Sequence, residues 1–227
     1  MAPAIVLCGG QGIRLRPLTV DTPKPLIPVA GRPIVDHIID FLQSHQITDI
    51  RLAGGYLVEE LQNHFKHTHL KVHDTGDADI ISRIRQLIQP LDEQILVLYG
   101  DTLSDVNIQD LLNFSYLQKD KIVVTAWPLR SNFGLFQIDE TEHVSQYLEK
   151  PTLDFWVNIG YFVIPSSCFE LLDEFSTFEA LLLHATSRKL LVAYRHRGTH
   201  ITINTRAELE DAEQQLNQLT QKTANFS

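Results

Sequence analysis

The sequence has few cysteines, no excess of positive charge and no long apolar run, and each absence narrows the functions open to it. Its 227 residues include two cysteines, Cys8 and Cys168, which form no CxxC pair and provide neither a disulfide framework nor a zinc knuckle. A net charge of −9 argues against an overall electrostatic affinity for nucleic acid or an anionic membrane. No stretch approaches the ~20 apolar residues of a membrane-spanning helix. We expect a reduced, cytoplasmic protein with no nucleic-acid or membrane partner.

Several other signals are missing too. The ten histidines show no HExxH motif and no paired ligand spacing, so we expect them at the surface or in the core. The apolar run 4–8 has no basic segment before it and is too short for a signal peptide. We find no internal repeat, low-complexity linker or clear domain boundary. We therefore expect a single domain over residues 1–227.

The positive charge that is present lies unevenly along the chain. Residues 1–32 hold four basic residues against one acidic residue, whereas the remainder of the chain is strongly acidic. The four basic residues are Arg14, Arg16, Lys24 and Arg32. Because these cations flank a glycine-rich stretch in an otherwise acidic protein, we expect an anion pocket there.

Apolar patterns along the chain alternate between continuous runs, typical of buried strands, and periods of 3.6 residues, typical of helices. The predicted strands cover residues 4–8, 48–53, 70–73, 94–99, 121–127, 190–194 and the region near 201, with shorter strands between 133 and 163. The predicted helices cover residues 33–46, 57–65, 80–88, 107–117, 167–174, 177–186 and 207–221. This order predicts an α/β fold with a doubly wound, mainly parallel sheet and helices on both faces.

The glycine-rich stretch 9–12 follows the first predicted strand. It is not a dinucleotide-binding fingerprint, because Leu15 stands where the third glycine would fall, and it is not a P-loop, because Lys24 does not follow a glycine. A bare GGxG can also be a tight turn and nothing more. The neighbours favour a phosphate site, because glycines present backbone N–H groups to phosphate oxygens. Arg14 and Lys24 supply two cations on a polar loop that we expect at the surface.

A second candidate site lies at the end of another predicted strand, where the run 94–99 leads into Gly100 and Asp101. Ligands of open α/β sheets bind beyond the carboxyl ends of the strands. We therefore expect the chemistry of this protein where residues 4–8 and 94–99 end.

These residues resemble the signature of the sugar-1-phosphate nucleotidyltransferases, GGxGTRLxPLT followed by PKPL. The resemblance continues along nearly the whole chain, in "YGDTLSDVN" (99–107), "YLEKP" (147–151), "VNIGYFV" (157–163) and "GTHITINT" (198–205). Within the family, the segments most similar to glucose-1-phosphate cytidylyltransferases are "DTG" (74–76), "SDVNI" (104–108) and "NFGLFQID" (132–139). In contrast, "RLRPLT" is more similar to the thymidylyl and guanylyl branches. The resemblance implies a Rossmann-like nucleotidyltransferase fold.

It also implies a reaction, in which a sugar 1-phosphate attacks the α-phosphorus of a nucleoside triphosphate in line and pyrophosphate leaves. The implied catalytic residues are Arg14, Lys24 and Asp101. The implied nucleotide-binding residues are Leu7, Gly9, Gly10, Gly12, Arg14, Asp74 and Gly76. The implied sugar-phosphate-binding residues are Glu149, Lys150 and Asn158. The implied ligands of a Mg²⁺ cofactor are Asp101 and Asn204.

Taken without the resemblance, some of these residues have plainer interpretations. Asp101 can cap a helix or a turn, Glu149 and Lys150 can belong to a solvated turn, and Asn158 can be an amide at a strand edge. The implied substrates are a nucleoside triphosphate and a sugar 1-phosphate, with CTP and glucose 1-phosphate leading, and a homo-oligomer is left open.

Four features depart from the family pattern. Ile13 replaces its threonine, and Ile81-Ser82 stands where the cytidylyl branch has two glycines. Asn204 replaces the second metal-binding aspartate, and Thr199 occupies a position that is often aromatic. These departures leave open a guanylyl- or thymidylyltransferase, or a non-catalytic homologue that binds a nucleotide or sugar phosphate and regulates another process. The β-helix repeats of longer members are absent, so we expect a catalytic domain alone.

Overall fold

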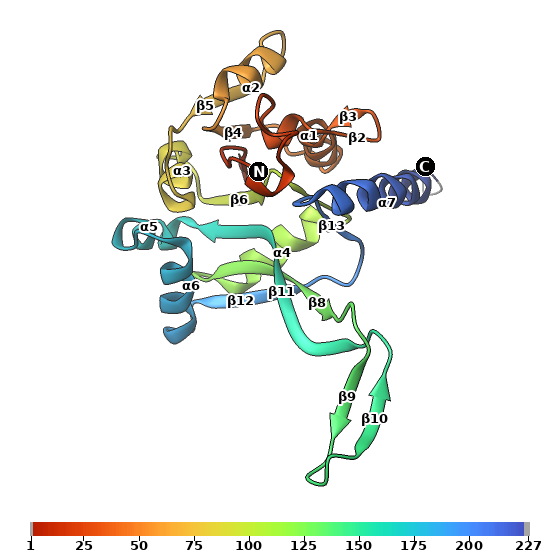
Figure 1. The fold of residues 1–227 in the computed structure, drawn as a ribbon. Helices are drawn as coiled ribbons and strands as arrows, with labels where there is room; N and C mark the ends of the chain where they lie inside the picture. The colour runs from red at the N-terminus through yellow and green to blue at the C-terminus, as the bar shows by residue number, and fades with distance from the viewer. Residues whose placement is uncertain (1, 225–227) are drawn as a thin grey trace.

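A computed structural model describes residues 2–224, with side chains described as far as residue 216. Its centre is a seven-stranded sheet in the order β12-β8-β11-β6-β1-β4-β5 (Figure 1). The strands, in chain order, are β1 (Ala4–Leu7), β4 (Ile50–Gly54), β5 (Lys71–Asp74), β6 (Gln94–Tyr99), β8 (Ile122–Arg130), β11 (Thr152–Pro165) and β12 (Leu191–Arg195). Neighbouring strands run parallel except for β11, which is antiparallel to both β6 and β8. The prediction of a mainly parallel α/β sheet is confirmed.

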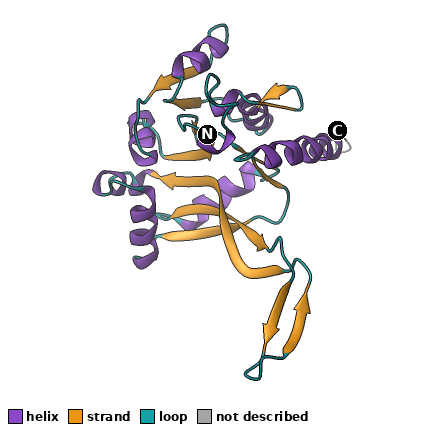
Figure 2. Cartoon of the chain, viewed as in Figure 1, coloured by secondary structure: helices purple, strands orange, loops and turns teal. Residues whose placement is uncertain are grey.

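The helices also agree with the predicted order. They are α1 (Ile34–Ser44), α2 (Val58–Phe65), α3 (Ile80–Leu87), α4 (Ile108–Gln118), α5 (Leu171–Glu174), α6 (Phe178–Ser187) and α7 (Arg206–Ala224), with short 3₁₀ helices η1 (Ile13–Leu15), η2 (Lys24–Leu26) and η3 (Ser166–Cys168). Helices lie on both sides of the strands (Figure 2). No helix within residues 2–224 is both long and apolar enough to cross a membrane.

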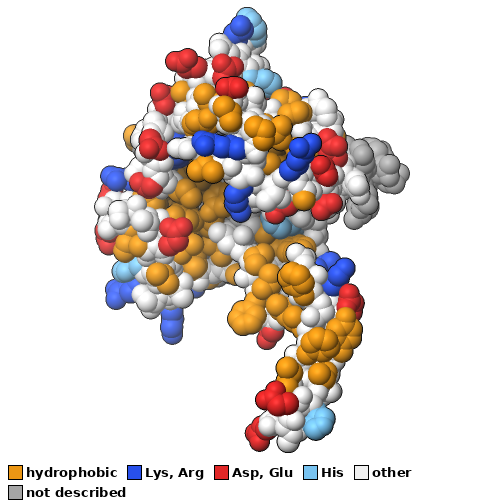
Figure 3. All heavy atoms as spheres, viewed as in Figure 1, with side chains coloured by type: hydrophobic (Ala, Val, Ile, Leu, Met, Phe, Trp, Pro, Cys, Tyr) orange, Lys and Arg blue, Asp and Glu red, His pale blue; other side chains and the backbone are white. Residues whose placement is uncertain are grey.

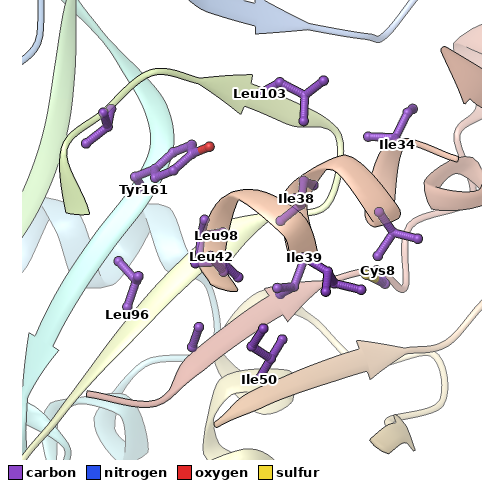
Figure 4. Packing of buried hydrophobic residues seen from close by; sticks show 14 of the residues in the cluster. Cys8, Ile34, Ile38, Ile39, Leu42, Ile50, Leu96, Leu98, Leu103 and Tyr161 are labelled. Atoms are coloured by element: carbon purple, nitrogen blue, oxygen red, sulfur yellow. The ribbon is translucent and has the colours of Figure 1, made fainter. Parts of the chain in front are cut away.

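The alternation of side chains along the central strands explains the two helical layers. Leu96 and Leu98 of β6 pack in one buried cluster with α1 and α4, whereas Ile95 and Val97 pack in a second cluster with α3, α5 and α6. Figure 4 shows the first cluster, in which Leu42 of α1 lies beside Leu98. All four β6 side chains are fully buried, as expected for a strand covered on both faces.

Three small two-stranded pairs complete the fold. They are β2 (Pro28–Val29) with β3 (Arg32–Pro33), β7 (Thr102–Ser104) with β13 (His200–Thr202), and β9 (Leu135–Ile138) with β10 (Val144–Leu148). In the β7–β13 pair, residues 200–202 lie beside β7, the strand that directly follows β6. The β9–β10 hairpin instead projects away from the sheet (Figure 1).

The direction and length of β11 differ from the expectation of short strands between 133 and 163. The strand has 14 residues, and the chain reaches it from β8 through the β9–β10 hairpin. A hairpin returns the chain in the opposite direction, whereas a parallel neighbour needs a crossover that is usually helical. The local pattern of β11 is apolar, as for the parallel strands, and does not reveal its direction.

Candidate functional site

The loops that follow β1 and β6 begin side by side. Leu7 and Tyr99 are partners in the parallel register, and the Gly100 N–H donates to the Leu7 carbonyl at 3.0 Å. A Cβ atom on Gly100 would lie 2.6 Å from that carbonyl oxygen, so this close approach requires glycine. The two strand ends singled out in the sequence therefore form one edge of the sheet.

The glycines of the first loop have different structural roles. Gly12 has φ +60°, a left-handed conformation that glycine adopts without strain. A Cβ atom on Gly9 would lie 1.8 Å from a nitrogen of Arg83, so Gly9 leaves room for that guanidinium and not for a ligand. A Cβ atom on Gly10 would meet nothing within 4 Å. Of these three positions, Gly10 is the one whose missing side chain opens space.

Lys24 lies at the centre of the predicted cation cluster. It begins the 3₁₀ helix η2 and is only 9% exposed, so the expectation of a surface position is wrong for this residue. Its ammonium pairs with the Asp101 carboxylate and donates to the Asn204 side-chain oxygen at 3.0 Å. Burial of a lysine requires such partners, because an unpaired charge away from water is costly.

Arg14 approaches the same group from the solvent side. Its Nη2 donates to the Asn204 side-chain oxygen at 2.9 Å, and its guanidinium is exposed. One amide oxygen thus accepts hydrogen bonds from both predicted phosphate-binding cations. The structure brings together Arg14, Lys24, Asp101 and Asn204 from the beginning, the middle and the end of the chain.

A capping box fixes the backbone beside Asn204. The Thr205 hydroxyl accepts from the Glu208 N–H at 3.2 Å, and the Glu208 carboxylate accepts from the N–H groups of Thr205 at 3.1 Å and Asn204 at 2.6 Å. The Ile203 N–H donates to the Asp101 carbonyl at 3.1 Å. The start of α7 is therefore held against the carboxyl end of β6.

Two adjoining cavities open on this cluster. The first, of about 440 Å³, is lined by Gly10, Gln11, Gly12, Ile13, Arg14, Lys24, Asp101 and Asn204. The second, of about 410 Å³, is lined by Leu7, Gly9, Gly10, Gln11, Asp77, Ala78, Asp79, Ile80, Arg83, Tyr99 and Asp101. They share Gly10, Gln11 and Asp101. A larger depression of about 550 Å³ lies between α3 and α5 and contains none of the predicted site residues.

Arg83 is a residue of this region whose role was not predicted. Its buried guanidinium donates to the carbonyls of Gly54 at 2.8 Å, Gly76 at 3.1 Å and Gly9 at 3.3 Å. It thus ties together the loops that follow β1, β4 and β5. Burial lowers the pKa of Arg83, and nearby carboxylates oppose that change. A signal was available, because Arg83 directly follows Ile81-Ser82, the pair that stands where the resemblance leads us to expect two glycines.

The remaining predicted nucleotide-binding residues lie at the edge of the site. Asp74 is exposed, and its carboxylate accepts from the Gly76 N–H at 2.9 Å in a local turn. Neither residue lines the two cavities. Gly76 contributes through its carbonyl, which positions Arg83.

The predicted sugar-phosphate residues are separated from the cluster. Glu149 and Lys150 are exposed where the β9–β10 hairpin joins β11, and they line neither cavity. Asn158 of β11 lies closer to the second cavity, which Tyr99 lines. Burial raises the pKa of Tyr99, and the nearby Asn158 side chain opposes that rise. Its side-chain oxygen also accepts from the Gly160 N–H at 2.8 Å.

The departure at Ile81-Ser82 does not add bulk to either cavity. Ile81 is buried in the core cluster beneath α3, and the Ser82 hydroxyl donates to Asp79 at 2.7 Å. Asp79 is the N-cap of α3, and its side chain also accepts from the Ser82 N–H. These two residues therefore support the helix and leave the cavities unobstructed.

Cys8 lies beneath the cluster and is not suited to act as a nucleophile. Burial, followed by the negative charge of Asp101, raises the pKa of its thiol to about 12. The thiolate is the reactive form of cysteine. The chemistry of the site must therefore depend on its charged and amide side chains.

The oxygen atoms of Asp101 and Asn204 are of the kind that Mg²⁺ prefers. Among the described residues, no group of three or more His, Cys, Asp and Glu side chains is placed to hold a metal ion. Asp101 and Asn204 nevertheless direct oxygens toward one point, because both accept from the Lys24 ammonium. Mg²⁺ commonly takes one or two carboxylates and completes its shell with water and phosphate oxygens. One carboxylate and one amide oxygen fit that arrangement.

Known proteins with a similar sequence or structure point to one family. Residues 3–204 match the family model described as nucleotidyl transferase. The chain is 31% identical over 175 residues to the bifunctional protein GlmU of Methanocaldococcus jannaschii, covering 75% of this chain and 42% of GlmU. It is 28% identical over 228 residues to the glucose-1-phosphate cytidylyltransferase of Salmonella typhi, covering 86% of this chain and 88% of that protein. It thus spans about two fifths of GlmU but most of the cytidylyltransferase.

The fold is similar to that of a solved structure. HddC from Yersinia pseudotuberculosis, complexed with GMP-PN, matches with a TM-score of 0.72 at 17% sequence identity, covering 95% of this chain and 100% of that one. At this identity the likeness concerns the fold alone. It agrees with the α/β architecture predicted from the sequence.

Proposed function

Because this chain belongs to the nucleotidyl transferase family, we propose that it transfers the nucleotidyl group of a nucleoside triphosphate to a sugar 1-phosphate and releases pyrophosphate. The observation that carries the proposal is the meeting of Arg14, Lys24 and Asp101 at the cavity beyond β1 and β6. Two cations and one carboxylate leave a local charge of +1 beside a glycine-rich loop. That arrangement suits a polyphosphate.

The proposed roles follow from where each group lies. Gly10 and Gly12 line the first cavity, where backbone N–H groups can contact phosphate oxygens without a side chain between them. Lys24 lines the same cavity, so its ammonium can neutralise the negative charge that develops on the α-phosphate once it turns from its partners toward the nucleotide. Arg14 reaches the same cavity from its exposed side and offers a planar fork to a second phosphate. No side chain of the chain is required as a nucleophile, because the sugar phosphate itself attacks.

Asp101 and Asn204 are the proposed ligands of Mg²⁺. When bound, the metal neutralises charge on the triphosphate and the leaving pyrophosphate. Because the protein offers one charged ligand, most of the binding energy must come from the triphosphate oxygens. In the structure, Lys24 hydrogen-bonds both ligand oxygens. Nucleotide binding would therefore move the lysine ammonium from these oxygens toward the phosphates.

The sugar phosphate is assigned to Glu149, Lys150 and Asn158. Asn158 lies near Tyr99, which lines the second cavity, so the sugar would lie near that residue. Glu149 and Lys150 are exposed at the base of the hairpin and line neither cavity. Their contribution depends on how the hairpin is placed when substrate is bound.

CTP and glucose 1-phosphate are the proposed substrates. The cytidylyl-like segments 74–76, 104–108 and 132–139 support this choice, as does the named activity of the Salmonella typhi relative. Ile81-Ser82 lies outside both cavities, so the missing glycine pair does not argue against a nucleotide there. GTP and dTTP remain the competing nucleotides.

A substrate panel tests the proposal. Pyrophosphate release is measured with CTP, dTTP, GTP, UTP and ATP against several sugar 1-phosphates, and the Arg14→Ala protein serves as the inactive variant. Arg16→Ala is the matched control, because Arg16 is also exposed and lines neither cavity. We expect release with CTP and glucose 1-phosphate that Arg14→Ala loses and Arg16→Ala keeps.

Thermal unfolding in the same mixtures distinguishes the alternatives. A ligand at 100 times its dissociation constant stabilises the folded chain by about 2.7 kcal/mol. Stabilisation without pyrophosphate release from any pair would identify a non-catalytic binding protein. Release with GTP or dTTP and not with CTP would move the chain to another branch of the family.

A further inference from the structure

The β9–β10 hairpin has one face that carries four apolar side chains. Phe136 pairs with Tyr147, and Ile138 pairs with Val144, so these four side chains lie on one face. A bulge between Val144 and Gln146 is what brings Val144 onto it. Each side chain of this apolar face is 54–61% exposed, and the Phe136 and Tyr147 rings lie 5.2 Å apart. Figure 3 shows hydrophobic side chains along much of the projecting hairpin.

The opposite face of the hairpin is different. Its outer part carries Gln137 and Gln146, which are partners and are both polar and exposed, and the Leu135–Leu148 pair lies on the same face nearer the base. Strands that alternate apolar and polar residues normally bury the apolar side. An isolated two-stranded hairpin is at best marginally stable in water, and exposed apolar edges invite further pairing. The apolar face therefore requires a covering surface that the described part of the chain does not supply.

The two ends of the hairpin carry opposite charges. Its turn contains Asp139, Glu140 and Glu142, all exposed. Three arginines lie against tryptophan rings beside its base, with Arg130 of β8 5.4 Å from the Trp127 ring, and Arg195 of β12 and the following Arg197 5.1 and 4.9 Å from the Trp156 ring. Glu149 and Lys150, at the base itself, carry opposite charges, so the arginines leave this end positive. Trp127 and Trp156 belong to β8 and β11, the strands that lead into and out of the hairpin.

We propose that the apolar face is covered by the same face of a second copy of this chain, with the two hairpins antiparallel. In a two-fold arrangement each surface meets its own copy, so an apolar face that fits itself is sufficient. The two hairpins are equal in length, and the acidic turn of each therefore reaches the arginine base of the other. Apolar contact and opposite charge then favour the same pairing. The inference goes beyond the transferase reaction and does not depend on it.

The size of the face sets the expected strength. Four side chains, joined by the nearby exposed Phe133 and Phe155, cover less than the ~1,600 Å² of a standard interface. We therefore expect a dimer that dissociates on dilution in the micromolar range.

Sedimentation velocity over a concentration series of about 1 to 100 μM tests the pairing. Phe136→Asp places a charge in the apolar face and is expected to weaken the dimer at least tenfold. Gln137→Asp adds the same charge at the next residue, on the opposite face, and should leave the dimer unchanged. A wild-type protein that is monomeric at every concentration overturns the proposal, and so does equal weakening by both variants.

A charge exchange tests the antiparallel arrangement. Arg195→Glu places a negative charge under the partner's acidic turn, and Glu140→Arg places a positive charge over the partner's arginines. Each change alone should weaken the dimer, and the double variant should recover most of the loss, because the two new charges attract across the interface. If the double variant is weaker than either single variant, the hairpins do not pair in this direction. Pyrophosphate release is measured separately, so failure of the dimer and failure of the reaction can be distinguished.

Discussion

The site cluster beyond β1 and β6 and the β9–β10 hairpin were both singled out in the sequence, yet their structures contrast sharply. In the cluster, Arg14 and Asn204 are 190 residues apart and joined by a 2.9 Å hydrogen bond. In the hairpin, Glu149 bonds its near neighbour Tyr147, and Lys150 lines neither cavity. One region is held in place by contacts from the whole chain, and the other by contacts within itself.

The contrast separates two halves of one proposed active site. The phosphate-binding half is assembled by its own side chains, because Arg14 and Lys24 already donate hydrogen bonds to Asn204, and Lys24 also pairs with Asp101. The sugar-phosphate half is divided between Asn158, which belongs to the sheet, and Glu149 and Lys150, which belong to the hairpin. We therefore expect substitutions in the cluster to affect turnover most, and substitutions in the hairpin to affect binding of one substrate.

The largest effect is expected for Lys24→Ala. Loss of one preorganised charge contact with the transition state should lower kcat about 10²–10³-fold. Because Lys24 is buried and pairs with Asp101, its loss should also lower the free energy of unfolding by about 1–3 kcal/mol. Arg14→Ala should lower kcat to a similar extent, but with a change in stability within about 0.5 kcal/mol, because Arg14 is exposed. Steady-state kinetics and urea unfolding measure the two effects. Near-wild-type turnover in Lys24→Ala would contradict the proposed cluster.

The next effect concerns the hairpin. Lys150→Ala should raise the KM for the sugar 1-phosphate about 10–150-fold, as expected for the loss of a charge-assisted hydrogen bond of about 1.5–3 kcal/mol. The KM for the nucleotide should not change. Lys66→Ala, on the exposed end of α2, is the matched control. If the two variants have the same KM for the sugar phosphate, Lys150 lies outside the site.

A further prediction concerns Asn204→Asp, a substitution at a proposed Mg²⁺ ligand in the site cluster. A second carboxylate should bind Mg²⁺ more tightly, so the Mg²⁺ concentration for half-maximal turnover should fall by about tenfold. Asp101→Asn should have the opposite effect and nearly abolish turnover. A Mg²⁺ titration of pyrophosphate release at saturating substrates compares the two variants with wild type. Identical curves for Asn204→Asp and wild type would place residue 204 outside the metal site.

The smallest effect is on the pH dependence of stability. Burial, followed by the charge of His196, lowers the pKa of His200 from 6.5 to about 4. As the pH falls from 6.5 to 4, the unfolded chain binds a proton that folded His200 does not, so stability decreases by at most about 1.4 kcal/mol per pH unit from this group. His200→Asn should make that decrease shallower. His143→Asn, on the exposed hairpin turn, should leave it unchanged. Urea unfolding at several pH values measures both slopes, and equal slopes for wild type and His200→Asn would refute the assignment.

Much of the fold could be predicted because it depends on local patterns. The run 94–99 was predicted to be a strand buried on both faces, and it is. A helix was predicted to begin at residue 107, and the Asn107 side chain caps it by accepting from the Asp110 N–H at 3.1 Å. The direction of β11 could not be predicted, because direction is decided by the connection and not by the strand itself.

The site was predicted in part, for a similar reason. The sequence contains signals for Arg14, Lys24 and Asp101, and the structure brings these residues together, while their chemical roles stay predictions. Burial of Lys24 could not be foreseen, because it depends on Asp101 and Asn204, which are distant in sequence. The use of Gly9 was also hidden, because the group that occupies its space is Arg83, 74 residues away. The hairpin position of Glu149 and Lys150 depends on the same long-range geometry.

The bond between Arg14 and Asn204 has a consequence for how the protein is made. Ribosomes deliver the amino terminus first, and segments generally begin to fold while later ones are still being synthesised. The glycine loop, η2 and the end of β6 exist long before β13 and the start of α7 emerge. Because residue 204 supplies the acceptor for both cations, the phosphate cluster can be completed only after nine tenths of the chain has been translated. Until then, a nascent chain exposes Arg14 and Lys24 without that partner.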